Sequence, residues 1–151
     1  MFQAELSYTS RFIREFDGSL DLKLWMKLLD EETKELVEAL QGTDRAHVLK
    51  EAADVLYVIA PVMALSQVLH DLQMLGPDLL RQINVLVKAS DKPMLAVSTM
   101  FSEETVAEAL KLVHESNMSK LGDDGKPIRR EDGKILKSKN YKEPDLTRLA
   151  A

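Results

Sequence analysis

The sequence of 151 residues contains no cysteine. This absence excludes a disulfide framework, a thiol nucleophile and a thiolate metal site, and it is compatible with a reducing, cytoplasmic location, which we expect. The start of the chain also lacks the basic, then apolar, then small-residue pattern of a secretory signal. The length favours one domain with a substantial hydrophobic core.

Long apolar runs are scarce as well. The longest, residues 52–69, is at the short limit for a membrane span and is interrupted by polar residues and a proline. We therefore read it as a buried helix and expect no membrane partner. The interrupting residues are Asp54, Pro61, Ser66 and Gln67.

Charge is distributed unevenly along the chain. The net charge of −5 combines −8 over residues 1–116 (11 basic against 19 acidic residues) with +3 over residues 117–151 (9 against 6). An acidic body of this kind is unsuited to general binding of nucleic acid through its phosphates. The sequence therefore predicts an acidic body with a basic tail and no nucleic-acid partner.

Apolar residues recur at steps of three and four, which is typical of amphipathic helices. Ser19, Asp44 and Ser102 are expected N-caps, and Gly42 and Gly122 are expected helix stops. The expected helices cover about residues 4–16, 22–40, 45–70, 79–89 and 103–121, and residues 94–100 are ambiguous.

Prolines and Asp-Gly pairs mark the other boundaries. Pro61 should kink the third helix or mark a local irregularity, Pro77 should start the next one, and Lys92-Pro93 should end it. Two Asp-Gly turns, at residues 124–125 and 132–133, predict a small hairpin. Residues 141–151 form an arm on the body or on a partner subunit, or are disordered. The predicted fold is an all-α bundle of four to five helices with a short C-terminal hairpin and extended tail.

Five acidic residues form the most informative pattern. Glu32 and Glu35 are neighbours on one helix face, next to Glu31, and Glu51 and Asp54 repeat the spacing on the next helix. Because two helices with a short connection pack antiparallel, Glu32, Glu35, Glu51 and Asp54 can converge. Converging carboxylates repel one another unless a cation joins them. Hard oxygen ligands without cysteine or histidine point to Mg²⁺ or Mn²⁺.

A solvent-exposed helix face is the alternative explanation of this acidic pattern. A glutamate-rich run such as residues 31–38 is, taken alone, more often a solvated helix face. Asp54 is harder to explain in this way, because it is the only charge in the apolar run and would need a partner such as Lys50 or Lys27. No histidine follows a glutamate at the spacing of di-iron bundles, which argues against a ferritin-like site.

The pattern resembles a known superfamily. Residues 31–36 (EETKEL) and 51–56 (EAADVL) resemble the E-E-x-x-E … E-x-x-D signature of the all-α nucleoside triphosphate pyrophosphohydrolases, which include MazG-like proteins and phosphoribosyl-ATP pyrophosphohydrolases. Residues 113–121 (VHESNMSKL), the two Asp-Gly-Lys segments, Tyr141 and residues 144–146 (PDL) look like the C-terminal pattern of the phosphoribosyl-ATP branch. The two signatures cover roughly residues 20–65 and 105–147.

The resemblance implies hydrolysis of an α–β phosphoanhydride to a monophosphate and pyrophosphate. Four carboxylates match the Mg²⁺ ligands, and Glu31 matches an accompanying acid that binds metal or serves as the base. Asn117 and Lys120 match the nucleotide-contacting N-x-x-K. The implied ligands are Glu32, Glu35, Glu51 and Asp54, and the candidate catalytic residues are Glu31, Glu32 and Glu35. Further candidate phosphate contacts are Lys27, Lys126, Arg129, Arg130, Lys134 and Lys137, although most of the hairpin residues among them are more commonly solvated.

One segment departs from the family pattern. Residues 70–101 intervene where relatives have a short connection, as a lid, a dimer contact or another bundle helix. We therefore expect a catalytic domain over residues 1–121 with an atypical insert at 70–101, and a hairpin and arm over 122–151 that belong to the same domain.

Two questions stay open at this point. Trp25 and Tyr57 are candidates for base stacking, but their spacing favours core or subunit-interface packing. The apolar central helix favours a homodimer or a dimer of dimers, with bundles completed between chains. The alternatives to an enzyme are a non-catalytic helical module that binds nucleotide or protein, and a structural bundle with a solvated acidic face.

Overall fold

The periodic apolar positions do form helices, and the predicted all-α class is confirmed. The structure is a computed structural model that describes residues 2–16 and 20–151. Within these residues it contains five helices and a two-stranded hairpin. The elements are α1 (Phe2–Glu15), α2 (Leu22–Ala39), α3 (Arg45–Asp71), α4 (Pro77–Met100), α5 (Glu103–Met118), β1 (Ile128–Arg129) and β2 (Ile135–Leu136).

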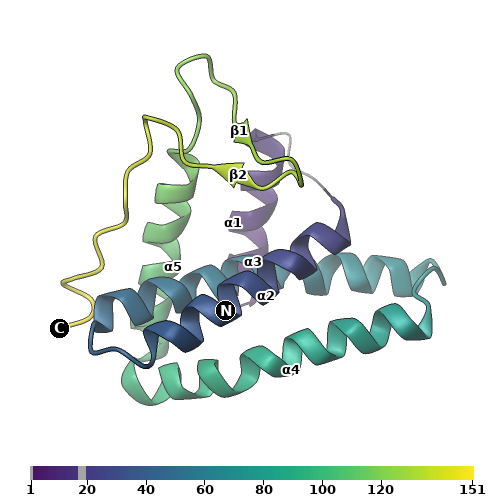
Figure 1. Cartoon of the computed structure of the whole chain (residues 1–151), viewed down its shortest axis with the longest axis horizontal. Helices are drawn as coiled ribbons and strands as arrows, with labels where there is room; N and C mark the ends of the chain where they lie inside the picture. The colour runs from purple at the N-terminus through teal and green to yellow at the C-terminus, as the bar shows by residue number, and fades with distance from the viewer. Residues whose placement is uncertain (1, 17–19) are drawn as a thin grey trace.

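Helix α3 is the centre of the fold. It packs against α2 most extensively, and also against α1, α5 and α4. Figure 1 shows α5 rising from the end of α4 past α3, and α1 rising beside it, with the hairpin near the upper ends of both helices. Leu29 and Leu36 of α2 and Leu49 and Val55 of α3 are fully buried where the two helices meet. Burial of this interface fixes α2 relative to α3, and therefore fixes the positions of their carboxylates.

Two of the three helix N-caps that the sequence predicts are present in the structure. Asp44 accepts a hydrogen bond from the His47 amide at 3.1 Å, and Ser102 accepts one from the Thr105 amide at 3.2 Å, which confirms both predicted caps. The predicted cap Ser19 lies outside the described residues. The side chain of Asp21 caps α2 by accepting from the Lys23 amide at 2.9 Å.

Both predicted glycine stops are wrong in position. Helix α2 ends at Ala39 with Leu40 as its C-cap, two residues before Gly42. Helix α5 ends at Met118, and the chain has already left the helix when it reaches Gly122. Neither glycine has a positive φ, so neither takes the left-handed conformation that a glycine stop requires.

The predicted break at Lys92-Pro93 is also wrong, because α4 runs without interruption to Met100. Pro93 removes one intrahelical hydrogen bond, but its ring is buried. Ile83, Ser90, Pro93 and Val97 bury one face of α4, which packs against α2 and α3. Packing against α2 and α3 therefore outweighs the tendency of Pro93 to end the helix. The segment that departs from the family pattern is largely this bundle helix, and its start at Gly76-Pro77 is as predicted.

Helix α3 is the one helix in the described residues that is long and apolar enough to cross a membrane. It nevertheless lies at the centre of the bundle, and Glu51 and Asp54 project from it. Pro61 lies inside this helix, which continues past it as one element. We assign α3 as a core helix, in agreement with the reading from its sequence.

The C-terminal segment lies on the body of the same chain. The hairpin pairs Arg129 with Ile135 in antiparallel register, as the Asp-Gly turns predict. Beyond it, Ala150 is buried and its carbonyl accepts a hydrogen bond from the Arg45 guanidinium at 2.8 Å. Of the alternatives left open for residues 141–151, the structure shows an arm docked on its own bundle.

Candidate functional site

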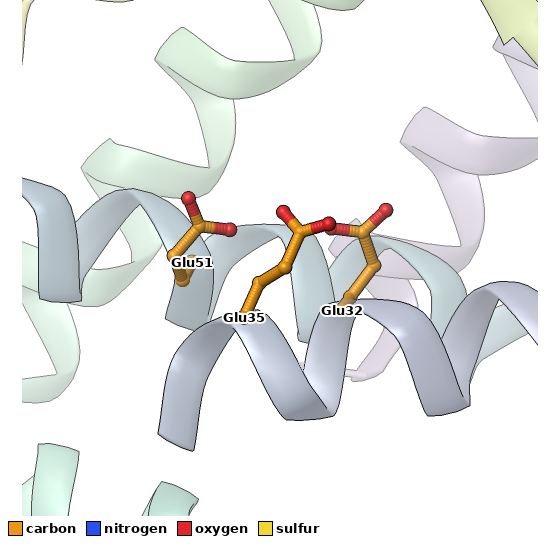
Figure 2. Close-up of side chains that lie close together, drawn as sticks. All are labelled: Glu32, Glu35 and Glu51. Atoms are coloured by element: carbon orange, nitrogen blue, oxygen red, sulfur yellow. The ribbon is translucent and has the colours of Figure 1, made fainter. Parts of the chain in front are cut away.

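Three carboxylates from two helices gather at one point. Glu32 and Glu35 rise from adjacent turns of α2, and Glu51 faces them from α3 (Figure 2). One oxygen from each of the three lies within 4.8 Å of the others. The paired spacing predicts that four carboxylates converge, and three of them gather here, whereas Asp54 is not part of this group. A cluster of this type can hold a divalent cation, because all its donors are hard oxygens.

Glu51 is the most buried member of this cluster, with 3% of its side chain exposed. Its Oε1 atom accepts from Lys50 Nζ at 2.8 Å and lies 3.1 Å from His47 Nε2. Its Oε2 atom is buried without a hydrogen-bond partner among the described residues. Burial raises the pKa of this carboxyl group, and Lys50 opposes that rise. An unsatisfied buried carboxylate oxygen is costly, and a bound cation would satisfy it.

Asp54 lies one turn further along α3. Its Oδ2 atom is 2.9 Å from Lys50 Nζ, so Lys50 is the cationic partner that a carboxylate in apolar surroundings needs. Burial first, and then the charges of Asp54 and Glu35, raise the pKa of Glu32 to about 7, although Lys134 and Lys50 counteract them. The site therefore holds a carboxyl group that titrates near neutral pH, as is common in functional sites.

Glu31 faces the hairpin instead of the cluster. It accepts from Lys134 Nζ at 2.8 Å and from the Arg130 guanidinium at 3.1 Å. Partial burial raises the pKa of Glu31, but the hydrogen bonds from Lys134 and Arg130 outweigh it, and the net shift is downward. In this structure Glu31 positions the hairpin over the site.

The end of α5 and the residues just after it supply polar groups opposite the carboxylates. Asn117 is buried and Lys120 half-buried, and both line the space above the cluster. The Asn117 side chain hydrogen-bonds Tyr57, whose hydroxyl lies 3.0 Å from His114 Nδ1. Burial lowers the pKa of His114 and, most strongly among several influences, that of Lys120. The chain from His114 through Tyr57 to Asn117 holds the Asn117 amide in place.

Two adjoining pockets surround these groups. One is mainly apolar and lies between α1, α2, α3 and the hairpin; the other is charged and lies between α2, α3, α5 and the tail. The residues shared by both pockets are Glu32, Asp54, Asn117, Lys120 and Lys134. Those lining only the apolar pocket include Phe12, Leu24, Trp25, Leu28, Val58 and Ile135. Those lining only the charged pocket include Glu35, Lys50, Ser116, Lys137 and Tyr141.

Three expected phosphate contacts do not line either pocket. Lys27 pairs with Asp132, Arg130 pairs with Asp132 and Glu31, and Lys126 is exposed in the loop before the hairpin. Trp25 and Tyr57 are buried in the core, and both also line the apolar pocket.

Three further cations line the charged pocket. Lys134 and Lys137 are among the candidate phosphate contacts that the sequence offers, whereas sequence reasoning named Lys50 only as a partner for Asp54 and gave it no role toward a ligand. The position of Lys50 beside Glu51 and four residues before Asp54 is the local signal for its place at the site. Lys134 and Lys137 carry no comparable local signal, because only the docking of the tail brings them to the pocket.

The charged pocket combines carboxylates and ammonium groups, and the apolar pocket adjoins it. Together the two pockets fit a ligand with an anionic part and a flat apolar part. The family model described as phosphoribosyl-ATP pyrophosphohydrolase matches residues 3–75, which contain α2, α3 and all of α1 except Phe2. Searches among curated proteins and among solved structures found no match. The match includes every carboxylate of the cluster and ends before α4.

Proposed function

Through residues 3–75 this chain belongs to the MazG-like all-α nucleoside triphosphate pyrophosphohydrolases, and on that premise we propose that it is a divalent-metal-dependent nucleotide pyrophosphohydrolase. The reaction breaks the α–β phosphoanhydride of a nucleoside triphosphate, or of a similar nucleotide, and releases pyrophosphate and a monophosphate. The observation that carries this proposal is the cluster of Glu32, Glu35 and Glu51, in which Glu35 lines the charged pocket and Glu32 lines both the charged and the apolar pocket.

The residues of the cluster fit Mg²⁺, or Mn²⁺ in its place. All donors are carboxylate oxygens, and the buried Oε2 atom of Glu51 needs a partner. We propose Glu32, Glu35 and Glu51 as ligands, with Asp54 at the margin of the cluster as the fourth. When bound, the ion neutralises phosphate charge and lowers the pKa of a coordinated water molecule.

The lysines of the charged pocket bind the phosphates in this proposal. Lys120, Lys134 and Lys137 line the pocket on the side of α5 and the hairpin, opposite the acidic cluster. An ammonium group is a compact charge that suits a phosphate oxygen. Asn117 lies in both pockets and is suited to a contact between the phosphates and the base, because its amide offers both a donor and an acceptor.

The apolar pocket accepts the nucleobase. Trp25 and Phe12 contribute aromatic surface there, and Leu24 and Ile135 contribute aliphatic surface. Such surfaces bury the faces of a flat ring, while the few polar groups at the margin fix its orientation. Asp54 and Lys120 line both pockets, so a base held in the apolar pocket can extend its phosphates into the charged one.

Hydrolysis needs one proton transfer. The oxygen of an attacking water molecule bonds to the α-phosphorus, the anhydride oxygen leaves with pyrophosphate, and a carboxylate of the cluster takes the proton. Glu31 is less suited to this role, because Lys134 and Arg130 occupy its carboxylate. We propose that Glu31 instead positions Lys134.

Pyrophosphate release from a panel of ribo- and deoxyribonucleoside triphosphates, with Mg²⁺ or Mn²⁺, tests the proposal. We expect turnover of at least one nucleotide and at least a 100-fold loss in Glu35→Gln and Asp54→Asn. Glu38→Gln is the matched control, because Glu38 is exposed on the same helix outside the cluster and both pockets. Binding of a nucleotide without hydrolysis would favour the non-catalytic module instead.

The proposal extends to the domain organisation of the chain and to its assembly. We propose that residues 1–121, with α4 in place of the short family connection, form the catalytic domain, and that residues 122–151 complete it by covering the site. We also propose a cytoplasmic homodimer or dimer of dimers. Exposed apolar side chains on α3 and α4 support the assembly, among them Met63, Val68, Val85 and Leu95.

A further inference from the structure

Lys50 lies inside the acidic cluster, where the proposed function has no step for it. Its Nζ atom is 2.8 Å from Glu51 Oε1 and 2.9 Å from Asp54 Oδ2, so it joins the two carboxylates that α3 contributes. Its side chain is 27% exposed, and it belongs to α3 itself. Lys50 is therefore a tethered cation at the place where a divalent ion is proposed.

The arrangement leaves Glu51 only partly satisfied. Lys50 and His47 both approach Oε1, whereas Oε2 is buried without a hydrogen-bond partner among the described residues. One ammonium group therefore balances charge in the cluster without completing its coordination. A divalent ion would bring more charge and more coordination positions, but it would compete with Lys50 for the same two carboxylates.

The same pocket offers Lys50 another anion. Lys50 lines the charged pocket together with Lys120, Lys134 and Lys137, the residues proposed to bind phosphate. Its four-carbon stem is flexible, so the ammonium group can turn from a carboxylate to a phosphate without movement of α3. Release from Glu51 and Asp54 therefore leaves Lys50 next to a new partner.

We propose that Lys50 is an exchangeable counterion that restrains metal binding in the empty site and contacts a phosphate of the nucleotide in the loaded one. Because the same ammonium group opposes the metal and attracts the phosphate, each ligand favours the other, and linkage makes this effect reciprocal. This inference rests on the proposed function. It assigns Lys50 as a positioning residue for the metal and a contact for the phosphate.

The variant Lys50→Met tests the inference in the full chain with two measurements. Binding of Mn²⁺ alone is followed by electron paramagnetic resonance, and binding of inorganic pyrophosphate in the presence of EDTA is followed by calorimetry. We expect Mn²⁺ to bind about tenfold more tightly to the variant and pyrophosphate to bind several-fold more weakly. A merely structural ion pair would not move the two affinities in opposite directions.

Lys34→Met is the matched control, because Lys34 pairs with Asp30 on the exposed face of α2, outside both pockets. We expect both of its affinities to equal those of the wild type. Lys50→Gln repeats the test with a neutral donor if removal of the ammonium group leaves Lys50→Met unfolded, as judged by circular dichroism.

The outcomes separate the inference from the proposed function. Unchanged affinities in folded Lys50 variants, or a weakening of both, overturn the role of Lys50 while the metal site stands. Failure of Mn²⁺ to bind either the wild type or the variants overturns the metal site as well. Opposite shifts in the two affinities support both.

Discussion

At the scale of single residues, the site consists of charged groups that are costly to bury one by one but that together can bind a metal ion and phosphate. Glu32 is a clear case, because burial and the neighbouring Asp54 and Glu35 raise its pKa to about 7. Such a group favours the protonated form in the folded chain. A divalent ion would reverse that preference by stabilising the carboxylate.

Glu32 makes the stability of the metal-free protein depend on pH. Between pH 4.5 and 7 the unfolded chain releases the proton of Glu32 while the folded chain retains it, so stability falls as pH rises through this window. The expected loss attributable to Glu32 is on the order of 1–3 kcal/mol. Urea unfolding in EDTA at pH 5 and pH 8 measures it.

Glu32→Gln isolates this effect. His114, whose pKa is lowered by burial, acts in the opposite direction, but it is common to both proteins and cancels in their difference. The wild type should lose stability relative to Glu32→Gln as pH rises, and Mg²⁺ should diminish that loss. A difference independent of pH would contradict the environment assigned to Glu32.

Tyr57→Phe tests the chain of hydrogen bonds behind Asn117. Loss of the hydroxyl leaves His114 Nδ1 without this partner and releases the Asn117 amide. We expect a loss of about 1–3 kcal/mol in stability and a several-fold rise in KM, with a smaller change in kcat. Tyr8→Phe is the control, since it keeps the ring that stacks on His114. Equal kinetic effects in both variants would argue against the positioning role.

At the scale of elements, the hairpin acts as a cover that brings Lys134 to the carboxylates. Lys134 follows Gly133, which has a φ of +93° and lies so near α2 that an added Cβ atom would be 3.4 Å from Leu24 Cδ2. A positive φ at this position is readily adopted only by glycine. The turn residue therefore determines where the ammonium group of Lys134 lies, which local strand preference alone would not.

Gly133→Ala should displace Lys134. The new Cβ atom would lie 3.4 Å from Leu24 Cδ2 in a backbone conformation that costs about 1–2 kcal/mol for an L-residue. We expect a rise in KM for the nucleotide of several-fold. Gly125→Ala is the matched control, because Gly125 also has a positive φ but its new Cβ would meet no atom within 4 Å. Both variants should lose similar stability, and steady-state kinetics should distinguish them.

At the scale of the whole molecule, the uneven charge has a structural explanation. The basic tail docks on the acidic body, and Lys134 and Arg130 pair with Glu31. Part of the acidic excess is thus neutralised within the chain, and part remains in the cluster. Several apolar side chains on α3 and α4 stay exposed to solvent, and they support the proposed assembly.

Assembly through α4 predicts sensitivity to charge on its exposed face. Val85 and Leu95 are 62% and 67% exposed, so a glutamate at either position should be tolerated by the isolated chain. We expect Val85→Glu and Leu95→Glu to shift the protein toward the monomer in sizing chromatography with light scattering. Leu20→Glu serves as a control, since Leu20 is similarly exposed but precedes α2 and belongs to neither α3 nor α4. A wild-type monomer would refute the assembly outright.

The sequence by itself determined the helical class, the caps Asp44 and Ser102, and the meeting of carboxylates from α2 and α3. These features depend on spacing within one helix or across one short connection, where backbone geometry leaves few alternatives. Only the tertiary structure decided the continuity of α4 through Pro93, and the arrival of Lys134 and Lys137 at the pocket. It also turned Glu31 toward the hairpin. Those outcomes depend on packing between distant segments, and local preference carries no information about which side chains such packing brings together.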